Sequence, residues 1–494
     1  MKRLYWHIIA IAVITLLAFW LRAANLGALN FYNDEYYHVN TAVGYLKFGE
    51  FKQYNFYTEQ LEKPYTRASI FTWQVAQSFK WFGVYEQSAR LPSLLWGTLL
   101  IPVLIILLLC FTKEPLIAYS VGLWITFDNF FVDMSRFTRM YSMMFVLSVL
   151  VVFGFYGFTQ AKTKSKRYWL AITGMAVLLN VLVFKELTIA LIAGLGVYIT
   201  LRSIIYLVTR NKTERYLFRL WLAGLGVGLA LVLLRLAGLN TVPLDALTWG
   251  ATPQWGYLTD VLSGLRLPTV GGVMLLFGAL SIWRYRSAKA LVAVLSLTLL
   301  IVFVFFSHRY DAKRYIAFII PFLYVISIAG VTQSLRWIGK KLQWRTKTVF
   351  ITSIVLLFLI GSKLSFPGVS ADGVILQKAL ADETYSDLKR SNVKSAYKYV
   401  ADHYETGDTV LIQGPRYYYW PDNTISVREL GYYKSLSLND FKQLEQSSAN
   451  GVWVLYSEQR KRHVAPEIRD YVNKNYEKIT GLDDTMVNVY YLAP

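Results

Sequence analysis

The chain has 494 residues, of which 55% are hydrophobic and only 17% are charged. Charged residues make up about a quarter of a soluble domain, so this composition, with a mean hydropathy of +0.36, excludes an ordinary soluble enzyme. The net charge of +20 does not indicate a nucleic-acid partner, because basic cytoplasmic loops explain such a charge in a membrane protein. One cysteine, Cys110, excludes an internal disulfide and argues against a cysteine-based metal site.

Apolar runs long enough to cross a bilayer core recur along the chain. The first run has a basic flank at Lys2 and Arg3 but is too long for a signal-peptide core, so we interpret it as a retained anchor. We predict about eleven transmembrane helices, at 4–24, 92–111, 115–133, 140–159, 168–184, 187–208, 217–238, 269–284, 289–307, 314–334 and 347–366. An odd number of spans puts the two termini on opposite sides of the membrane.

The orientation follows from the loops after the fourth, sixth, eighth and tenth spans, which are all rich in lysine and arginine. Such loops face the cytoplasm, and they do so here if the N-terminus is cytoplasmic. Their basic residues are Lys162, Lys164, Lys166, Arg167, Arg210, Lys212, Arg215, Arg219, Arg284, Arg286, Lys289, Arg336, Lys340, Lys341, Arg345 and Lys347. The sequence therefore predicts a polytopic α-helical membrane protein whose first loop, 25–91, and tail from 367 lie outside.

The first outer loop contains two stretches, 35–48 and 68–82, with the amphipathic or aromatic pattern of helices at a membrane surface. Just before and into the first of them runs FYNDEYYH, Phe31–His38, with the adjacent carboxylates Asp34 and Glu35. A structural interpretation of this pair is helix capping, because an aspartate side chain can accept the unpaired amides of a helix start.

The tail differs in kind from the rest of the chain. Short apolar strands alternate in it with helical segments, which is typical of a small α/β domain. The predicted strands are 409–414, 451–457 and 486–492, and the predicted helices are 386–404, 439–447 and 464–477. We therefore predict a transmembrane domain, 1–366, and an extracytoplasmic C-terminal α/β domain, 367–494.

Ionisable residues gather at the predicted outer boundary of the membrane. Such residues are costly at this depth, so they tend to face a cavity and to pair. They are Asp128, Asp133, Arg136 and Arg139 after the third span, Lys185 and Glu186 after the fifth, and His308, Arg309, Asp311, Lys313 and Arg314 after the ninth. Each cluster also has a structural interpretation. Arg139 could extend its head group to the interface, Lys185 could pair with Glu186, and Asp311 could pair with Arg314.

Together these clusters suit one kind of chemistry. Arginine offers paired donors to phosphate oxygens at headgroup depth, and a nearby carboxylate can take the proton of an attacking hydroxyl. Cations that stabilise a leaving phosphate complete a group transfer from a lipid phosphate carrier. The alternative from another class is a transporter or flippase of a lipid-linked sugar, although the paired halves and broken helices of transporters are not evident. A third interpretation, a receptor for envelope polysaccharide, leaves the outer charges without a role.

The chain resembles the membrane-embedded type-C glycosyltransferases, in particular the group with the protein O-mannosyltransferases and the lipid A aminoarabinose transferase. The resemblance covers about the first 340 residues and depends on an ordered set of motifs. These are NDEYYH (33–38), EQSARLPSLLWG (86–97), SRFTRMYS (135–142), FKE (184–186) and RYIAFIIPFL (314–323).

The resemblance implies a polyprenyl- or dolichyl-phosphate sugar as donor and inversion at the anomeric carbon. In the family the acidic pair of the first outer loop supplies the catalytic carboxylate, and Asp34 takes that place here with Glu35 beside it. Family positions that face the carrier phosphate match Arg136, Arg139, Arg309 and Arg314, whereas Arg90 matches a position with a structural role. Many relatives have an aspartate where this chain has Met140 and Tyr141.

The predicted site therefore has three parts. The catalytic residues are Asp34 and Glu35; the donor-phosphate residues are Arg136, Arg139, Lys185, Arg309 and Arg314; the supporting residues are His38, Tyr141, Glu186, His308 and Asp311. We expect no required cofactor, with a divalent metal near Asp34, Glu35 and His38 left open. The expected partners are the polyprenyl-phosphate sugar (or its pyrophosphate counterpart), a protein, lipid or polysaccharide acceptor, and membrane lipids. The expected location is a prokaryotic plasma membrane.

Overall fold

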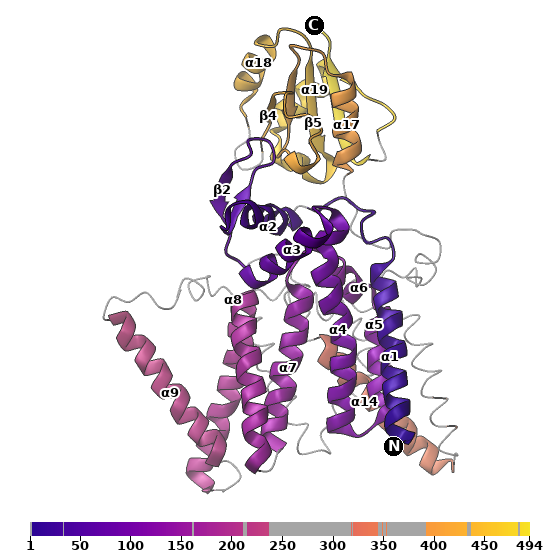
Figure 1. Cartoon of the computed structure of the whole chain (residues 1–494), viewed down its shortest axis with the longest axis vertical. Helices are drawn as coiled ribbons and strands as arrows, with labels where there is room; N and C mark the ends of the chain where they lie inside the picture. Colours follow the sequence, from indigo (N-terminus) through magenta and orange to yellow (C-terminus); the bar gives the residue numbers. More distant parts are fainter. Residues whose placement is uncertain are drawn as a thin grey trace. The chain divides into compact units, whose positions relative to one another are not determined.

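The structure is a computed structural model that describes residues 2–32, 34–160, 163–210, 215–236, 318, 320–343, 348, 352, 392–431, 436–482 and 485–494. The chain divides into two compact units, which we call the helical unit and the mixed unit (Figure 1). The helical unit comprises Met1–Ala24, Arg67–Phe71 and Arg90–Tyr385, and the mixed unit comprises Asn25–Thr66, Thr72–Ala89 and Ser386–Pro494. The first predicted outer loop thus shares a unit with the C-terminal segment, whereas we expected a boundary near residue 366.

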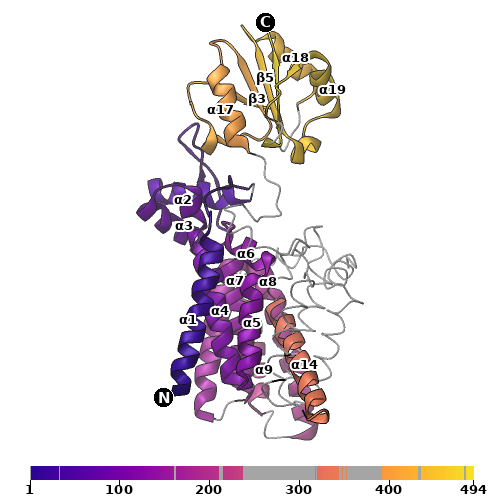
Figure 2. The same cartoon turned by 90° about the vertical axis from the view of Figure 1, so that its right-hand side faces the viewer.

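The helical unit contains most of the apolar sequence. Its helices are α1 (Lys2–Ala23), α4 (Glu86–Thr112, whose first turn belongs to the mixed unit), α5 (Pro115–Phe127), α6 (Asn129–Ser135), α7 (Tyr141–Gln160), α8 (Thr163–Thr209), α9 (Arg215–Leu236) and α14 (Ile320–Lys341). Helix α5 lies against α1 and α14, and α7 lies against α8 (Figures 1 and 2). Within the described residues, four helical segments are long and apolar enough to cross a membrane: Leu4–Ala23, Glu86–Thr112, Tyr141–Thr159 and Leu191–Thr209.

Burial distinguishes the helices at the centre of this unit from those at its edge. In the apolar part of α7, 83% of residues are buried, against 17% in α1 and 28% in the second half of α8. Helix α7 therefore forms the core of the described bundle. The apolar side chains that α1 and α8 expose suit contact with lipid, since a bilayer is as apolar as they are.

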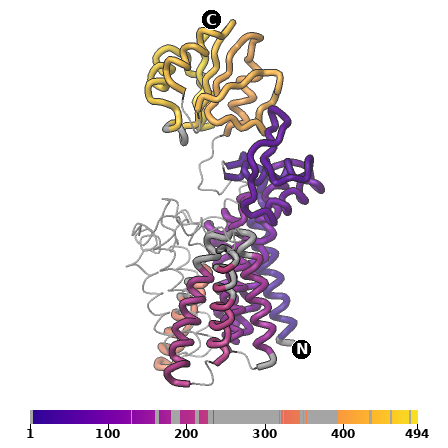
Figure 3. The backbone as a smooth tube through the Cα atoms, turned by 90° about the vertical axis from the view of Figure 1, so that its left-hand side faces the viewer, coloured from indigo at the N-terminus to yellow at the C-terminus, as the bar shows by residue number. Residues whose placement is uncertain are grey.

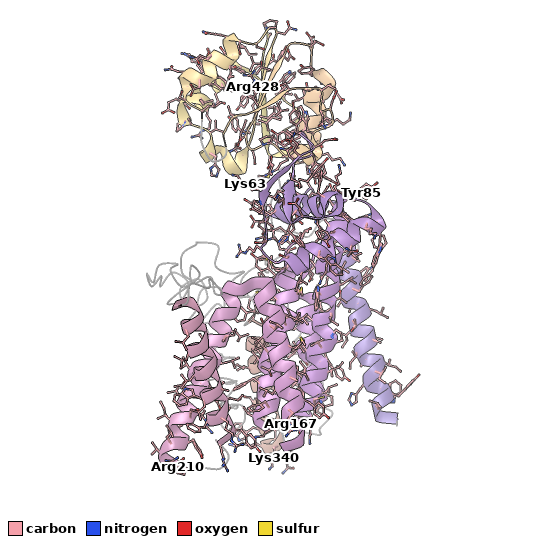
Figure 4. All side chains as sticks on the ribbon, turned by 60° about the vertical axis from the view of Figure 1, so that its left-hand side comes forward. Lys63, Tyr85, Arg167, Arg210, Lys340 and Arg428 are labelled. Carbon is pink, nitrogen blue, oxygen red and sulfur yellow. The ribbon has the colours of Figure 1, made fainter. Side chains whose placement is uncertain are left out.

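One predicted reversal of the chain lies inside α8. We expected spans at 168–184 and 187–208, joined by an outer turn at Lys185 and Glu186, and the helix assignment of α8 runs through both positions without a break. A straight helix of 47 residues would be about 70 Å long, yet Arg167, near its start, and Arg210, just after its end, lie at the same end of the helical unit (Figure 4). The first and second halves of α8 therefore run in opposite directions.

Three basic residues show how the predicted cytoplasmic loops are arranged. Arg167, Arg210 and Lys340 are exposed and lie at the same end of the helical unit (Figure 4). They belong to three of the four loops in which the positive-inside rule predicted lysine and arginine. Their gathering at one end is the arrangement that the predicted orientation requires.

Gly97 lets α4 approach α6 closely. A Cβ atom added at Gly97 would lie 1.9 Å from Ser135 Oγ and 2.5 Å from Ser135 Cβ, so one of the helices would have to move. We expect Gly97→Ala to destabilise the protein by about 1–3 kcal/mol, as overpacking does. The matched control is Gly174→Ala in α8, where a Cβ would meet no atom within 4 Å and helix propensity should raise stability by up to about 1 kcal/mol.

Thermal unfolding in detergent of both glycine variants tests this packing. Changes of opposite sign would support it. An unchanged melting temperature in Gly97→Ala would show that the contact with Ser135 is not tight.

The mixed unit begins with the first outer loop. Helices α2 (Glu35–Phe48) and α3 (Ser69–Phe82) confirm the two predicted helices, and between them β1 (Lys52–Tyr54) pairs antiparallel with β2 (Leu61–Pro64). Helix α2 ends at Gly49, whose φ of 74° is left-handed and whose amide donates to the Tyr45 carbonyl. Glycine takes this conformation without the steric cost of a Cβ.

The C-terminal part of the mixed unit is a five-stranded sheet in the order β4-β3-β5-β7-β6. Its strands are β3 (Thr409–Ile412), β4 (Val427–Glu429), β5 (Val452–Ser457), β6 (Glu477–Lys478) and β7 (Val487–Leu492). Strands β4, β3 and β5 are parallel, with Leu411 opposite Val454 in the register, and β7 runs antiparallel to β5 and β6. Its helices are α17 (Val393–His403), α18 (Leu438–Gln446) and α19 (Pro466–Asn475), with short 3-10 turns η4 (Tyr417–Tyr419) and η5 (Glu458–His463).

Alternation along β5 explains why helices cover both faces of this sheet. Val452, Val454 and Tyr456 share a core with Phe441 of α18 and with Ile468 and Val472 of α19. The intervening Trp453 contacts Tyr399 of α17 on the other face, since neighbouring side chains of a strand point to opposite sides. Figure 2 shows α17 on one side of the sheet and α18 and α19 on the other, and Figure 3 shows the same segment in orange to yellow.

Candidate active site

The acidic pair lies in a closed turn at the start of α2. The Glu35 amide donates to the Tyr32 carbonyl at 2.8 Å, and the Tyr32 amide donates to Glu35 Oε2 at 2.6 Å. Asp34 occupies the N-cap position with φ −74° and ψ −20°, but its side chain makes no capping hydrogen bond. The capping interpretation therefore does not describe Asp34, which is half-buried, whereas Glu35 is fully buried and bonded to the turn.

Aromatic residues of the C-terminal segment surround this turn. The ring of Phe31 lies 5.1 Å from Tyr418 and 6.1 Å from Tyr419 between centroids. Tyr36 packs edge-on against both Phe31 and Tyr419, at 5.8 and 6.3 Å. The guanidinium of Arg416 lies 4.5 Å from the centre of the Tyr36 ring, within the range of a cation–π contact. The segment that follows β3 is thus packed on the acidic turn.

Two hydrogen bonds of Tyr419 join this segment to the first outer loop. The Phe31 amide donates to the Tyr419 hydroxyl at 2.7 Å. The Tyr419 hydroxyl donates to Glu86 Oε1 at 2.8 Å, and Glu86 is the first residue of α4. Sequence analysis gave no indication of this contact, because the partners Phe31 and Tyr419 are 388 positions apart in the chain.

Burial makes the tyrosines around the turn harder to ionise than an exposed tyrosine. It raises the pKa of Tyr36 and of Tyr419 well above the ordinary tyrosine value, with Arg416 opposing the rise at Tyr36. Burial likewise raises the pKa of Tyr397 to about 12 and that of Tyr417 to about 12. Their hydroxyls therefore keep their protons at physiological pH and can donate hydrogen bonds.

His38 has a packing role in the structure. It is fully buried, its Nδ1 atom lies 2.8 Å from Thr72 Oγ1 of α3, and its ring meets Tyr65 edge-on at 5.3 Å. These contacts join α2 to α3. They give His38 a part in the scaffold that carries the acidic turn.

The predicted phosphate ligands Arg136 and Arg139 lie in the turn between α6 and α7. Arg136 Nη1 donates to the carbonyls of Arg22, at 2.9 Å, and Ala24. Those carbonyls lie at the C-terminal end of α1, where a cation is favourable. Arg136 therefore caps α1, a structural role that the spacing of the motif did not indicate.

The backbone around Arg139 is held in place by Ser93. Ser93 Oγ of α4 lies 2.7 Å from the Phe137 carbonyl and 3.1 Å from the Arg139 carbonyl. The buried Arg139 guanidinium lies 5.9 Å from the ring centre of Tyr141, the first residue of α7. Tyr141 thus neighbours a predicted phosphate ligand. Arg90, for which we expected a structural role, is buried as well.

Sequence reasoning missed Arg22, although a lone arginine late in an apolar run is a detectable signal. Its fully buried side chain donates to Ser135 Oγ at 3.2 Å and to the carbonyls of Ala18, Ile125 and Thr126 at 3.0–3.3 Å. Nearby, Asp128 Oδ1 accepts from the Phe131 amide at 3.2 Å and Oδ2 accepts from the Tyr324 hydroxyl of α14. Arg22 and Asp128 thus tie the helix ends that carry the arginine turn.

The remaining predicted site residues fall outside this description. Lys185 and Glu186 lie in α8, and their side chains are not among those described. His308, Arg309, Asp311, Lys313 and Arg314 lie outside the described residues. Asp34 belongs to the mixed unit and Arg139 to the helical unit, and the structure defines each by itself. Within the described residues, no group of three histidine, cysteine or acidic side chains is arranged to hold a metal ion.

No family model and no curated protein sequence matches the chain. Among solved structures, it is similar to ArnT from Cupriavidus metallidurans in the apo state, at 16% identity and a TM-score of 0.57 over 99% of this chain and 98% of that one. The same protein bound to undecaprenyl phosphate gives 14% identity and a TM-score of 0.55 over 98% of both chains. The Archaeoglobus fulgidus oligosaccharyltransferase in complex with zinc and sulfate gives 13% identity and a TM-score of 0.51, over 95% of this chain and 71% of that one.

These similarities confirm the predicted resemblance at the level of the fold. ArnT, a lipid A aminoarabinose transferase, and the oligosaccharyltransferase are type-C glycosyltransferases, and this chain shares their fold. Sugar, acceptor and catalytic residues do not follow from a fold alone.

Proposed function

We propose that this chain is an inverting glycosyltransferase that moves a sugar from a polyprenyl-phosphate carrier to a hydroxyl acceptor at the outer face of a membrane. The shared fold supports lipid-linked sugar transfer in general. The observation that carries the specific proposal is the state of the acidic pair. Glu35 is buried and bonded to the turn, while Asp34 is half-buried with a side chain not used in helix capping.

In the proposed reaction Asp34 is the general base. The Asp34 carboxylate takes the proton of the acceptor hydroxyl while that oxygen attacks the anomeric carbon. The bond between the anomeric carbon and the carrier phosphate oxygen breaks, and its electron pair leaves with the polyprenyl phosphate. One displacement inverts the anomeric centre. A positioned base contributes about 100- to 10,000-fold to such a step.

The leaving phosphate gains charge, so cations at its site would stabilise the transition state. Arg139 is the described residue that best suits this role, because Arg136 already caps α1. Lys185, Arg309 and Arg314 complete the proposed donor site. ArnT bound to undecaprenyl phosphate is a structural neighbour, which supports a polyprenyl phosphate as the donor lipid.

The membrane arrangement is part of the same proposal. About eleven helices, a cytoplasmic N-terminus and an extracytoplasmic C-terminal α/β domain would place the acidic turn outside a prokaryotic plasma membrane. The basic residues gathered at one end of the helical unit support this orientation.

Transfer in detergent distinguishes this proposal from a transporter. Purified protein would be incubated with a labelled polyprenyl-phosphate sugar and an extract of envelope acceptors, and the product would be examined by NMR. We expect the label to appear in a glycoside of inverted anomeric configuration. A donor that stays intact in detergent but crosses the bilayer of a proteoliposome would establish the transporter instead.

A further inference from the structure

We propose that Tyr419 of the C-terminal segment is a positioning residue, which holds the Asp34 turn in its reactive geometry through a relay to Glu86. The inference rests on the proposed function, since it concerns the same acidic turn. It assigns the C-terminal segment a part in the chemistry that neither the fold nor the motifs of the first 340 or so residues specify.

The relay has a single direction. A backbone amide can only donate and a carboxylate can only accept, so the Tyr419 hydroxyl accepts from the Phe31 amide, at 2.7 Å, and donates to Glu86 Oε1, at 2.8 Å. Both bonds are of ordinary length. The hydroxyl is thus fixed at both ends, and it fixes the Phe31 amide in turn.

The position of Phe31 passes directly to the acidic turn. Tyr32, the next residue, forms the two reciprocal hydrogen bonds with Glu35 that enclose Asp34. The start of this turn is therefore anchored by the Tyr419 hydroxyl. A general base must lie within hydrogen-bond reach of the proton that it takes. A shift at Phe31 would change the distance from the Asp34 carboxylate to the acceptor hydroxyl.

The hydrogen bonds of the Tyr419 hydroxyl can be removed without loss of the contacts of its ring. The buried ring meets Phe31, Tyr36 and Tyr418, and phenylalanine would keep these contacts while it removes one oxygen. Burial raises the pKa of Tyr419 well above its ordinary value, so the proton donated to Glu86 is retained at any working pH. The Arg416 contact with Tyr36 is a second tie between the same two segments.

The first test is Tyr419→Phe, assayed for sugar transfer in detergent. We expect kcat to fall by about 10- to 100-fold, since a misplacement of about 1 Å can cost 100-fold, while KM for the donor lipid changes less than about twofold. The matched control is Tyr456→Phe, which removes another buried hydroxyl bond, to Tyr490, within the sheet of the same unit. We expect its kcat to equal that of the wild type.

The second test is a conservative pair at the other end of the relay. Glu86→Gln keeps an oxygen that accepts from Tyr419, so its kcat should stay within about threefold of the wild type, whereas Glu86→Ala should fall as far as Tyr419→Phe. The double variant Tyr419→Phe, Glu86→Ala should be no slower than either single variant, because both remove one relay. Should Tyr419→Phe fail to accumulate, the glutamine and alanine variants decide the question alone.

The outcomes separate this inference from the proposed function. Equal kcat in wild type and Tyr419→Phe, or in Glu86→Gln and Glu86→Ala, would overturn the relay while transfer by the wild type keeps the function. Absence of transfer by the wild type itself, with any polyprenyl-phosphate sugar, would overturn the function. A rise in donor KM with unchanged kcat would make Tyr419 a binding residue and would also contradict the inference.

Discussion

Replacing Asp34 by asparagine is expected to lower kcat for sugar transfer by about 100- to 10,000-fold, the range lost with a general base. The amide keeps the shape of the side chain but cannot take a proton. Asparagine is also a good residue for the start of a helix, so the start of α2 should be kept and the variant should reach the wild-type level in the membrane. The measurement is steady-state transfer in detergent, with thermal unfolding of the same preparation.

The adjacent Glu35 supplies the matched control for this prediction. In Glu35→Gln the amide oxygen can still accept from the Tyr32 amide, so the turn should persist with a loss of about 1–3 kcal/mol in stability and of less than about tenfold in kcat. Asp34→Asn should therefore mainly lower kcat, whereas Glu35→Gln should mainly lower stability. Full activity in Asp34→Asn would remove that residue from the mechanism, and a larger loss of kcat in Glu35→Gln would exchange their roles.

Arg22→Met is expected to cause the largest loss of stability in the helical unit. Methionine has a similar length but leaves Ser135 Oγ and the carbonyls of Ala18, Ile125 and Thr126 without this donor. A hydrogen bond to a charged group contributes about 1.5–3 kcal/mol, so we expect a loss of at least about 3 kcal/mol. Thermal unfolding in detergent measures it.

Arg210→Met is the matched control, because Arg210 is exposed just after α8 and lies over the Tyr206 ring at 6.0 Å. A surface substitution of this kind should change stability by less than about 0.5 kcal/mol. If Arg22→Met melted at the wild-type temperature, the buried arginine would have no part in joining α1, α5 and α6.

Local hydrophobic patterns were sufficient to predict α2 and the longer strands of the sheet. The range of α2 was found because its apolar residues follow an amphipathic helical pattern. Strands β3, β5 and β7 were found because each is an apolar run buried in the sheet. Strands β4 and β6 were missed. They lie at the edges of the sheet and have only three and two residues, which is too short to show an alternating apolar pattern.

Contacts between distant segments were the part that the sequence could not supply. Asp34 was identifiable from its motif. Arg416 and Tyr419, which contact Tyr36 and Phe31 beside it, belong to a segment predicted as a separate domain. The arginines after α6 were identified by charge, yet only the hydrogen bonds of Arg136 to the end of α1 show that it caps a helix. Residue type indicated where chemistry was possible, and the long-range contacts indicated which residues hold the scaffold.

Mass spectrometry of envelope components would test the central claim most directly, in a strain that lacks this chain and is complemented with either the wild type or Asp34→Asn. We predict that the deletion removes a hydroxyl-linked sugar from one class of protein, lipid or polysaccharide, that the wild type restores it, and that Asp34→Asn does not, although it reaches the same level in the membrane. Restoration by Asp34→Asn, or an envelope that keeps every sugar in the deletion strain, would contradict the account.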